Sequence, residues 1–166
     1  MSDIRLKQTL TDNVDAITLD WLKTPAHLLD ETHALQTAVI VALGTDRLAN
    51  PEDALPDLDS DDRRGWWGDL SAEEIWGGWP IGSRLWLISR AKITGAAARD
   101  GATVTRVEDY IREALQPFLE AGIASKMTVN ASRSGREEID AEVVLFRGPK
   151  PFVALRYQAL WDEVTQ

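Results

Sequence analysis

The 166-residue chain carries 44% hydrophobic and 27% charged residues, an ordinary globular composition that suits one domain spanning residues 1–166. Its net charge of −9, with scattered Lys and Arg, disfavours a nucleic-acid partner because the mean field repels phosphate. The chain lacks cysteine, an apolar signal core and any segment long enough to span a bilayer, which excludes disulfides and thiolate metal sites and predicts no membrane partner.

The N-terminal half begins with a predicted strand and helix. The stretch DAITLDWLK at 15–23 alternates in the manner of a half-buried strand. From residue 27 to 49 the apolar period becomes helical, with Asp30 or Thr32 as a start signal and Gly44 at the end. Residues 50–82 are rich in Pro, Asp, Gly and Trp, which predicts a long connection with little regular structure.

The C-terminal half predicts helices followed by a hairpin. IGSRLWLISRAK at 81–92 reads as a helix with Ser83 as its cap, and 103–122 as a longer helix with Thr105 and Glu108 as a capping box. The segments 125–131 and 137–146 alternate as strands around a turn with Gly135, and 152–161 is one more strand or a short helix.

This order of elements predicts an α+β fold, in which a small antiparallel or mixed sheet with a C-terminal hairpin packs against two or three helices. The expected core combines the apolar stripe of the long helix with inward residues of the sheet and of the first helix: Val39, Leu43, Ile111, Leu115, Phe118, Val129, Val143 and Leu145. A terminal hairpin also leaves a strand edge with unpaired backbone groups, although the sequence does not tell which strand forms it.

The acidic residues of the long connection invite a metal or catalytic reading, and each has a simpler rival. Asp57, Asp59 and Asp61 alternate as in a calcium-binding EF-hand loop, but Asp62 and Gly68 occupy the places that need glycine and glutamate. Solvated acids that pair with the neighbouring arginines are the better reading. Glu73 and Glu74, or Asp69 with Glu73, could form a glycosidase pair, but nearby carboxylates are common in so acidic a chain.

Histidine and serine chemistry is equally weak. His27 and His33 lack the spacing of a helical zinc site, and no nucleophile elbow is present. The sequence therefore predicts no catalytic residue, no cofactor and no metal ligand.

Five tryptophans crowd into one window, interleaved with glycines: Trp66, Trp67, Trp76, Trp79 and Trp86. Glycine lets backbone segments approach closely, and each indole can bury a large area while its N–H needs a partner. Such a segment either packs on its own core or forms a protein-binding surface, and both readings make the pair Trp66–Trp67 anchors rather than catalysts.

The ordered motifs TDR, DRRGWWGD and GSRLW, with YIREALQPFLEAG and the final hairpin, make the chain resemble the Mu-type phage baseplate protein family. That family is the counterpart of the small wedge protein of contractile-tailed phages, and the resemblance covers about Ala34 to Leu160. The broader family has a Glu-Pro-Arg triplet after its first helix. Here Asp46 and Arg47 match the acid and the arginine, without a proline between them.

The resemblance implies a structural virion protein of the tail baseplate, assembled in the bacterial host cytoplasm. Its implied partners are a larger wedge protein at the inner ring and the tail sheath protein, which it would template by strand addition, with hub and tube proteins as further candidates. The residues assigned to partner binding are Arg47, Arg63, Arg64, Trp66, Trp67, Arg84 and Trp86. We expect an arginine fork on a carboxylate from Arg47, Arg63 or Arg64. The alternatives are a tail-associated peptidoglycan hydrolase that uses a carboxylate pair, and a small adaptor unrelated to phage.

Overall fold

The computed structural model describes residues 6–10, 17–21, 23–27, 34–57, 59–88, 101–134 and 138–160. The chain divides into two compact units, Met1–Val41 and Ala42–Gln166. Each unit is described separately below, and the expectation of a single domain stays a prediction.

The first unit contains an antiparallel pair of strands, β1 (Leu6–Leu10) and β2 (Ile17–Trp21), in which Leu6 pairs with Trp21. The strand predicted at 15–23 is confirmed as β2, whereas β1 was not predicted. Helix α1 (Ala34–Gly44) spans the boundary between the units and ends at the glycine that the sequence singled out. The two cap candidates, Asp30 and Thr32, lie outside the described residues.

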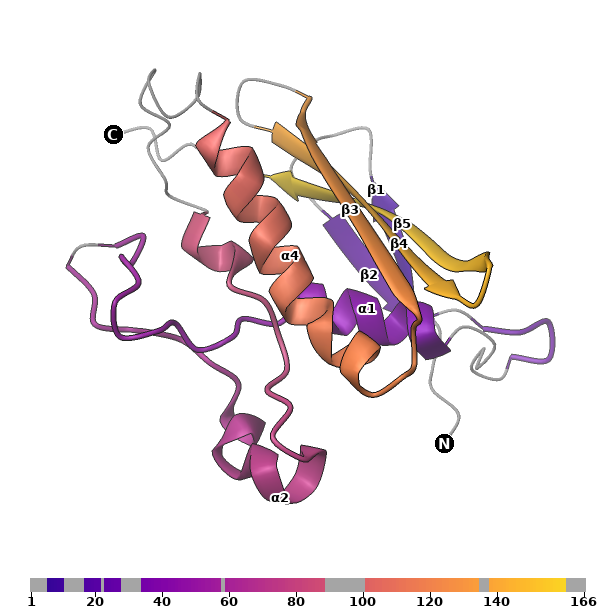
Figure 1. Ribbon diagram of the computed structural model, residues 1–166, viewed down its shortest axis with the longest axis horizontal. Helices are drawn as coiled ribbons and strands as arrows, with labels where there is room; N and C mark the ends of the chain where they lie inside the picture. Colours follow the sequence, from indigo (N-terminus) through magenta and orange to yellow (C-terminus); the bar gives the residue numbers. More distant parts are fainter. Residues whose placement is uncertain are drawn as a thin grey trace. The chain divides into compact units, whose positions relative to one another are not determined.

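The second unit is built on a three-stranded antiparallel sheet with the order β3-β4-β5 (Figure 1). Its strands are β3 (Lys126–Arg133), β4 (Glu138–Arg147) and β5 (Lys150–Leu160), so the predicted hairpin and the optional last strand are both confirmed. The predicted turn residue Gly135 lies outside the described residues. Along β4 every second residue is buried, which gives the sheet one apolar face.

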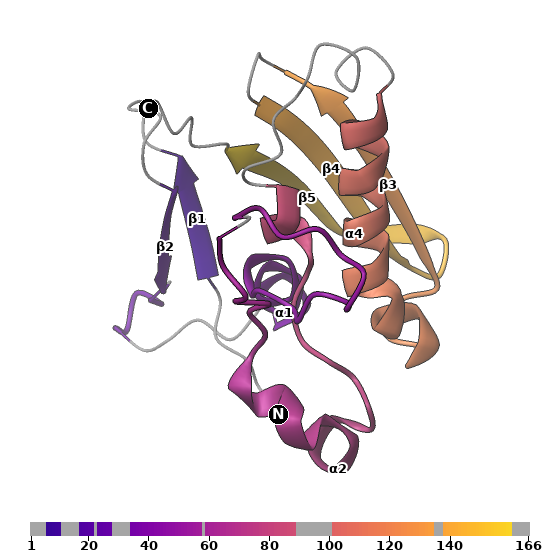
Figure 2. The ribbon, with the colours of Figure 1, turned by 90° about the vertical axis from the view of Figure 1, so that its left-hand side faces the viewer.

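Helix α4 (Ala102–Glu120) lies along β3 and supplies the other half of the core (Figure 2). It buries Val107, Ile111, Ala114, Leu115 and Phe118 at helical spacing, against the buried face of the sheet. All eight predicted core residues are buried, seven of them in this unit and Val39 in the first. The α+β prediction is confirmed.

The predicted capping box of α4 is wrong. The helix begins earlier, after Gly101 in a left-handed conformation, so Thr105 lies within the first turns and its hydroxyl donates back to the carbonyl of Gly101. The Glu108 carboxylate accepts from the amide of Ala131 on β3 and from Arg112. The Glu108 carboxylate, which the capping-box pattern assigned to the start of the helix, thus binds a strand of the sheet instead.

Residues 50–82 hold more regular structure than their composition predicts. A 3-10 turn, η1 (Trp67–Ser71), leads directly into a short helix, α2 (Ala72–Trp76), which ends at Gly77 in the left-handed conformation. Of the helix predicted at 81–92, the described part contains only the 3-10 turn η2 (Leu85–Ile88). None of the helices in the described ranges is long and apolar enough to cross a bilayer.

Candidate functional site: an arginine clamp and an exposed tip

The motifs TDR and GSRLW, far apart in the sequence, meet through their backbones. Asp46 and Ser83 form a parallel β-bridge, in which the amide of Arg47 donates to the carbonyl of Ser83 (3.0 Å) and the amide of Ser83 donates to the carbonyl of Thr45 (2.9 Å). The buried Ser83 hydroxyl donates to the carbonyl of Leu43 (2.8 Å). Ser83 therefore links two segments, and its predicted role as a helix cap is wrong.

Gly82 permits this close approach. Its φ of +112° is a conformation that side chains rarely adopt, and a Cβ there would lie 2.6 Å from the carbonyl oxygen of Thr45. The DRRG motif joins the same region, because the amide of Ala49 donates to the carbonyl of Arg63 (3.0 Å). Three motifs that are separate in the sequence thus form one structural site.

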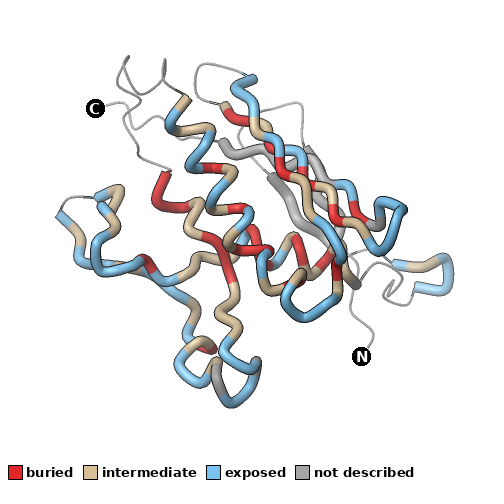
Figure 3. The backbone as a smooth tube through the Cα atoms, viewed as in Figure 1, coloured by how far each residue is buried: buried red, intermediate tan, exposed pale blue. Residues whose placement is uncertain are grey.

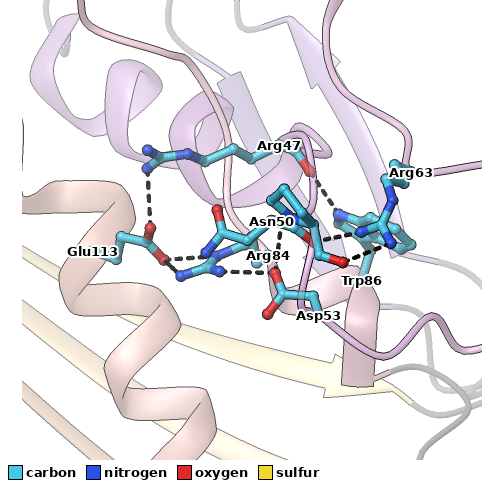
Figure 4. Close-up of polar contacts among 8 residues, drawn as sticks. Arg47, Asn50, Asp53, Arg63, Arg84, Trp86 and Glu113 are labelled. Atoms are coloured by element: carbon cyan, nitrogen blue, oxygen red, sulfur yellow. Dashed lines mark hydrogen bonds and ion pairs between the residues drawn. The ribbon is translucent and has the colours of Figure 1, made fainter.

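Arg84 lies at the centre of a charged network that we call the arginine clamp, formed by Arg47, Asp53, Arg84 and Glu113 (Figure 4). The Nε and Nη2 atoms of Arg84 donate to one carboxylate oxygen of Glu113, at 2.9 and 2.6 Å, and Nη1 donates to Asp53 at 2.8 Å. Arg47 contacts the other oxygen of Glu113 at 3.5 Å. The clamp ties α4 to the segments that follow α1 and precede η2.

The contacts of the clamp favour the charged forms of Asp53 and Arg84. Burial alone would raise the pKa of Asp53, but hydrogen bonds from Arg84 and from the Asn50 amide outweigh it and lower that pKa. Burial likewise opposes the charge of Arg84, while its bonds to Glu113 and Asp53 raise its pKa. The Arg84 side chain is 14% exposed, so these ion pairs are better shielded from water than ordinary surface pairs.

Trp86 packs beneath the clamp as a buried anchor. Its indole N–H donates to the carbonyl of Arg47 (2.8 Å), and the Arg64 guanidinium lies 4.7 Å from its ring centroid. Arg64 also pairs with Asp46 at 2.5 Å, from a backbone with a φ of +53°. The Arg63 guanidinium donates to the carbonyls of Asn50 and Pro51.

The adjacent tryptophans Trp66 and Trp67 have opposite environments. Trp66 is half-buried, and its ring covers Gly68 so closely that a Cβ on this glycine would lie 2.3 Å from it. Trp67 is 79% exposed. Trp66 thus covers the backbone of its own loop and Trp67 is largely exposed, and the role of both as anchors stays a prediction.

The seven residues assigned to partner binding fall into two groups. Arg47 and Arg84 belong to the arginine clamp, and four more lie in the segments beside it: Arg63, Arg64, Trp66 and Trp86. Trp67 is the exposed residue at the start of η1. Sequence reasoning missed the carboxylates Asp53 and Glu113, because in so acidic a chain nothing distinguishes a carboxylate with a tertiary partner from a solvated one, and it named Asp46 only as the acid of the triplet. Arg84 contacts two carboxylates, those of Asp53 and Glu113. The described contacts of Arg47 and Arg64 are with one carboxylate each, Glu113 and Asp46 respectively.

The arrangement holds chain segments together. Among the described residues, no group of three or more His, Asp or Glu side chains lies where it could hold a metal ion. Asp62 and Asp57 accept bonds from nearby backbone amides of their own loop, which is how acids stabilise turns. Glu74 lies on α2 directly after Glu73, and the side chain of the latter is outside the description.

Comparison with known proteins agrees with these motifs. The family model described as phage protein GP46 matches residues 35–150. The chain is 45% identical over 100 residues to the baseplate protein gp46 of Escherichia phage Mu, a match that covers 60% of this chain and 61% of that protein. It is 31% identical over 124 residues to the Mu-like prophage FluMu protein gp46 of Haemophilus influenzae, covering 75% of each. No solved structure matches the chain.

The Mu protein is described as a baseplate protein, which favours the baseplate reading over the carboxylate-pair alternative. The chain belongs to the phage GP46 family, and it is similar to gp46 proteins of phage Mu and of a Mu-like prophage, the first of which is described as a baseplate protein.

Proposed function

We propose that this protein is a structural component of a phage tail baseplate, which joins a larger wedge protein at the inner ring of a contractile tail and templates the sheath by accepting a strand from a sheath subunit on β5. The observation that carries the proposal is the sheet order β3-β4-β5, which leaves β3 and β5 as edge strands. Edge strands present backbone donors and acceptors to a neighbouring chain.

The β3 edge is already occupied in part. The amide of Ser134 donates to Glu138, which fixes the alternation along β3, so the backbone groups of even-numbered residues face β4 and those of odd-numbered residues face outward. Two of the outward groups have partners on α4, since Ala131 donates to Glu108 (2.9 Å) and the carbonyl of Val129 accepts from Arg112 (3.2 Å). A strand added to β3 would have to displace these side chains.

The β5 edge is the better acceptor. Continuing the same alternation through β4, residues 153, 155, 157 and 159 of β5 direct their backbone groups to β4. Residues 154, 156 and 158 then direct theirs away from the sheet. This row of outward donors matches the ladder that an incoming strand requires.

A proline on β5 tests this assignment. Ala154→Pro removes an outward donor and spares the ladder to β4, whereas proline at Glu142 in the central strand, or at Thr128 facing β4, would break the fold itself. Ala154→Ser, which keeps the donor, is the matched control. Thermal unfolding must first establish that both variants are folded.

We expect Ala154→Pro to give tails with a complete baseplate and no sheath in a complementation assay read by electron microscopy, and Ala154→Ser to give normal tails. Normal contractile tails from the folded proline variant would overturn strand addition at β5.

A further inference from the structure

A second surface lies on the tip, which we define as residues 67–76, comprising η1 and α2. Figures 1 and 2 both draw this segment projecting away from α4 and the three-stranded sheet. Three large apolar side chains are exposed there: Trp67 at 79%, Leu70 at 92% and Ile75 at 60%. Figure 3 shows the same segment mostly in the exposed colour. Apolar side chains gathered in this way mark interaction sites.

The backbone of the tip is held in a defined conformation. The Asp69 carboxylate accepts from the amide of Ile81 (3.1 Å), which closes the base of the tip. Gly77 and Gly78, both at positive φ, donate to the carbonyl of Ala72 and end α2. Trp67 and Leu70 are three residues apart in a 3-10 turn, so they share one face.

This rigidity lowers the entropy that binding would cost, since the exposed apolar groups are already placed. Trp67 also lies against its neighbour Trp66, with ring centroids 5.4 Å apart and planes tilted by 49°. A tryptophan supported in this way is the type of residue that dominates binding energy at protein interfaces.

The charges around the tip are acidic. Within residues 67–76 the acidic residues are Asp69, Glu73 and Glu74, no residue is basic, and Glu74 is exposed. The neighbouring arginines are engaged elsewhere in the same unit, because Arg63 donates to backbone carbonyls and Arg64 to Asp46. An exposed apolar surface with an acidic border is complementary to an apolar hollow with a basic border.

We propose that the tip inserts into an apolar hollow bordered by Lys and Arg on the larger wedge protein. The assignment rests on the proposed function, which supplies that neighbour. A second copy of this chain is the poorer occupant, since two acidic borders would face each other and repel. The arginine clamp then has the role of holding the base of the tip in place.

The test uses isothermal titration of the full-length chain into the purified larger wedge protein. The double variant Trp67→Ser with Leu70→Ser removes the apolar contact, and Leu48→Ser, which is 56% exposed and lies outside residues 67–76, is its control. Glu74→Lys reverses one border charge, and Glu120→Lys at the end of α4 is its control. All substituted side chains are exposed, so the thermal unfolding of each variant should match the wild type.

We expect the double variant to weaken binding tenfold or more and Leu48→Ser to leave it unchanged. Glu74→Lys should weaken binding at low salt more than at about 0.5 M salt, because screening removes the border attraction, whereas Glu120→Lys should not. If the wild type binds and the double variant binds equally well, the tip is not the contact surface, and the proposed function is unaffected. Failure of the wild type to bind the wedge protein would instead contradict the proposed function. Self-association in sedimentation equilibrium that the double variant abolishes would make a second copy the occupant and overturn the choice of partner.

Discussion

At the scale of single residues, Arg84 joins three side chains of the second unit. It contacts Glu113 and Asp53 and lies 5.1 Å from the ring centroid of Tyr110. Lysine has a single nitrogen at its end, so it cannot reproduce the planar arrangement in which three guanidinium nitrogens reach two carboxylates. The two carboxylates would then lose part of their pairing in a poorly solvated place.

We therefore expect Arg84→Lys to lower the free energy of unfolding by about 1–3 kcal/mol, a figure reduced from that of a fully buried pair because Glu113 is 32% exposed. Arg106→Lys, an exposed substitution on α4, is the control and should change it by less than about 0.5 kcal/mol. Urea unfolding followed by circular dichroism measures both. Equal stabilities for the two variants would show that the fork geometry of Arg84 does not matter.

The residue scale is also where sequence reasoning failed most often. It identified Arg84, Trp86 and Arg47 from their motifs but not their carboxylate partners, because tertiary pairing leaves no local pattern. It assigned Ser83 and Glu108 to helix caps, since the local rule considers only near neighbours. In the fold, a backbone carbonyl 40 positions away and an amide on β3 compete for these side chains and win.

At the scale of elements, periodicity predicted most of the second unit. The apolar stripe of α4 and the alternation along β3 and β4 give the correct type and the correct buried face. The short elements η1 and α2 were not predicted, because five residues are too few to show a helical period, and the described part of the helix predicted at 81–92 contains only the 3-10 turn η2. The strand β1 was not predicted, because its sequence LKQTL lacks a clear alternation of apolar and polar residues.

Leu115 tests the packing between these elements. Its side chain is 0% exposed on the face of α4 that covers the sheet, so Leu115→Ala should cost roughly 2–5 kcal/mol through lost burial and a residual cavity. Leu119→Ala, at a half-buried position of the same helix, should cost clearly less. A loss below about 0.5 kcal/mol for Leu115→Ala, measured by denaturant unfolding, would be incompatible with a core position.

At the scale of the whole molecule, acid should weaken the fold through specific carboxylates. The bond from the Ala131 amide, followed by the contact with Arg112, lowers the pKa of Glu108 although burial opposes it. Between the lowered pKa and the ordinary one, the unfolded chain binds more protons than the folded protein. The stabilisation is therefore complete above the ordinary pKa and is lost as the pH falls through the folded-state value.

We expect the free energy of unfolding to decrease as the pH falls below about 5, and Glu108→Gln to flatten part of that decrease. Glu120→Gln, at the exposed end of the same helix, is the matched control. Urea titrations at a series of pH values give the profile. An identical slope for wild type and Glu108→Gln would contradict a lowered pKa at this carboxylate.

The bridge between residues 45–47 and 82–83 also bears on how the family can vary. This bridge, which we call the clasp, brings together the two ends of the segment between them. The free-energy cost of closing such a loop rises only logarithmically with its length, by about 0.6 kcal/mol for each doubling. Residues can be added to or removed from the far end of this segment at little thermodynamic cost, provided that Gly82 and its neighbours are kept. We expect the tip, at the far end of this segment, to tolerate changes of length with little loss of stability.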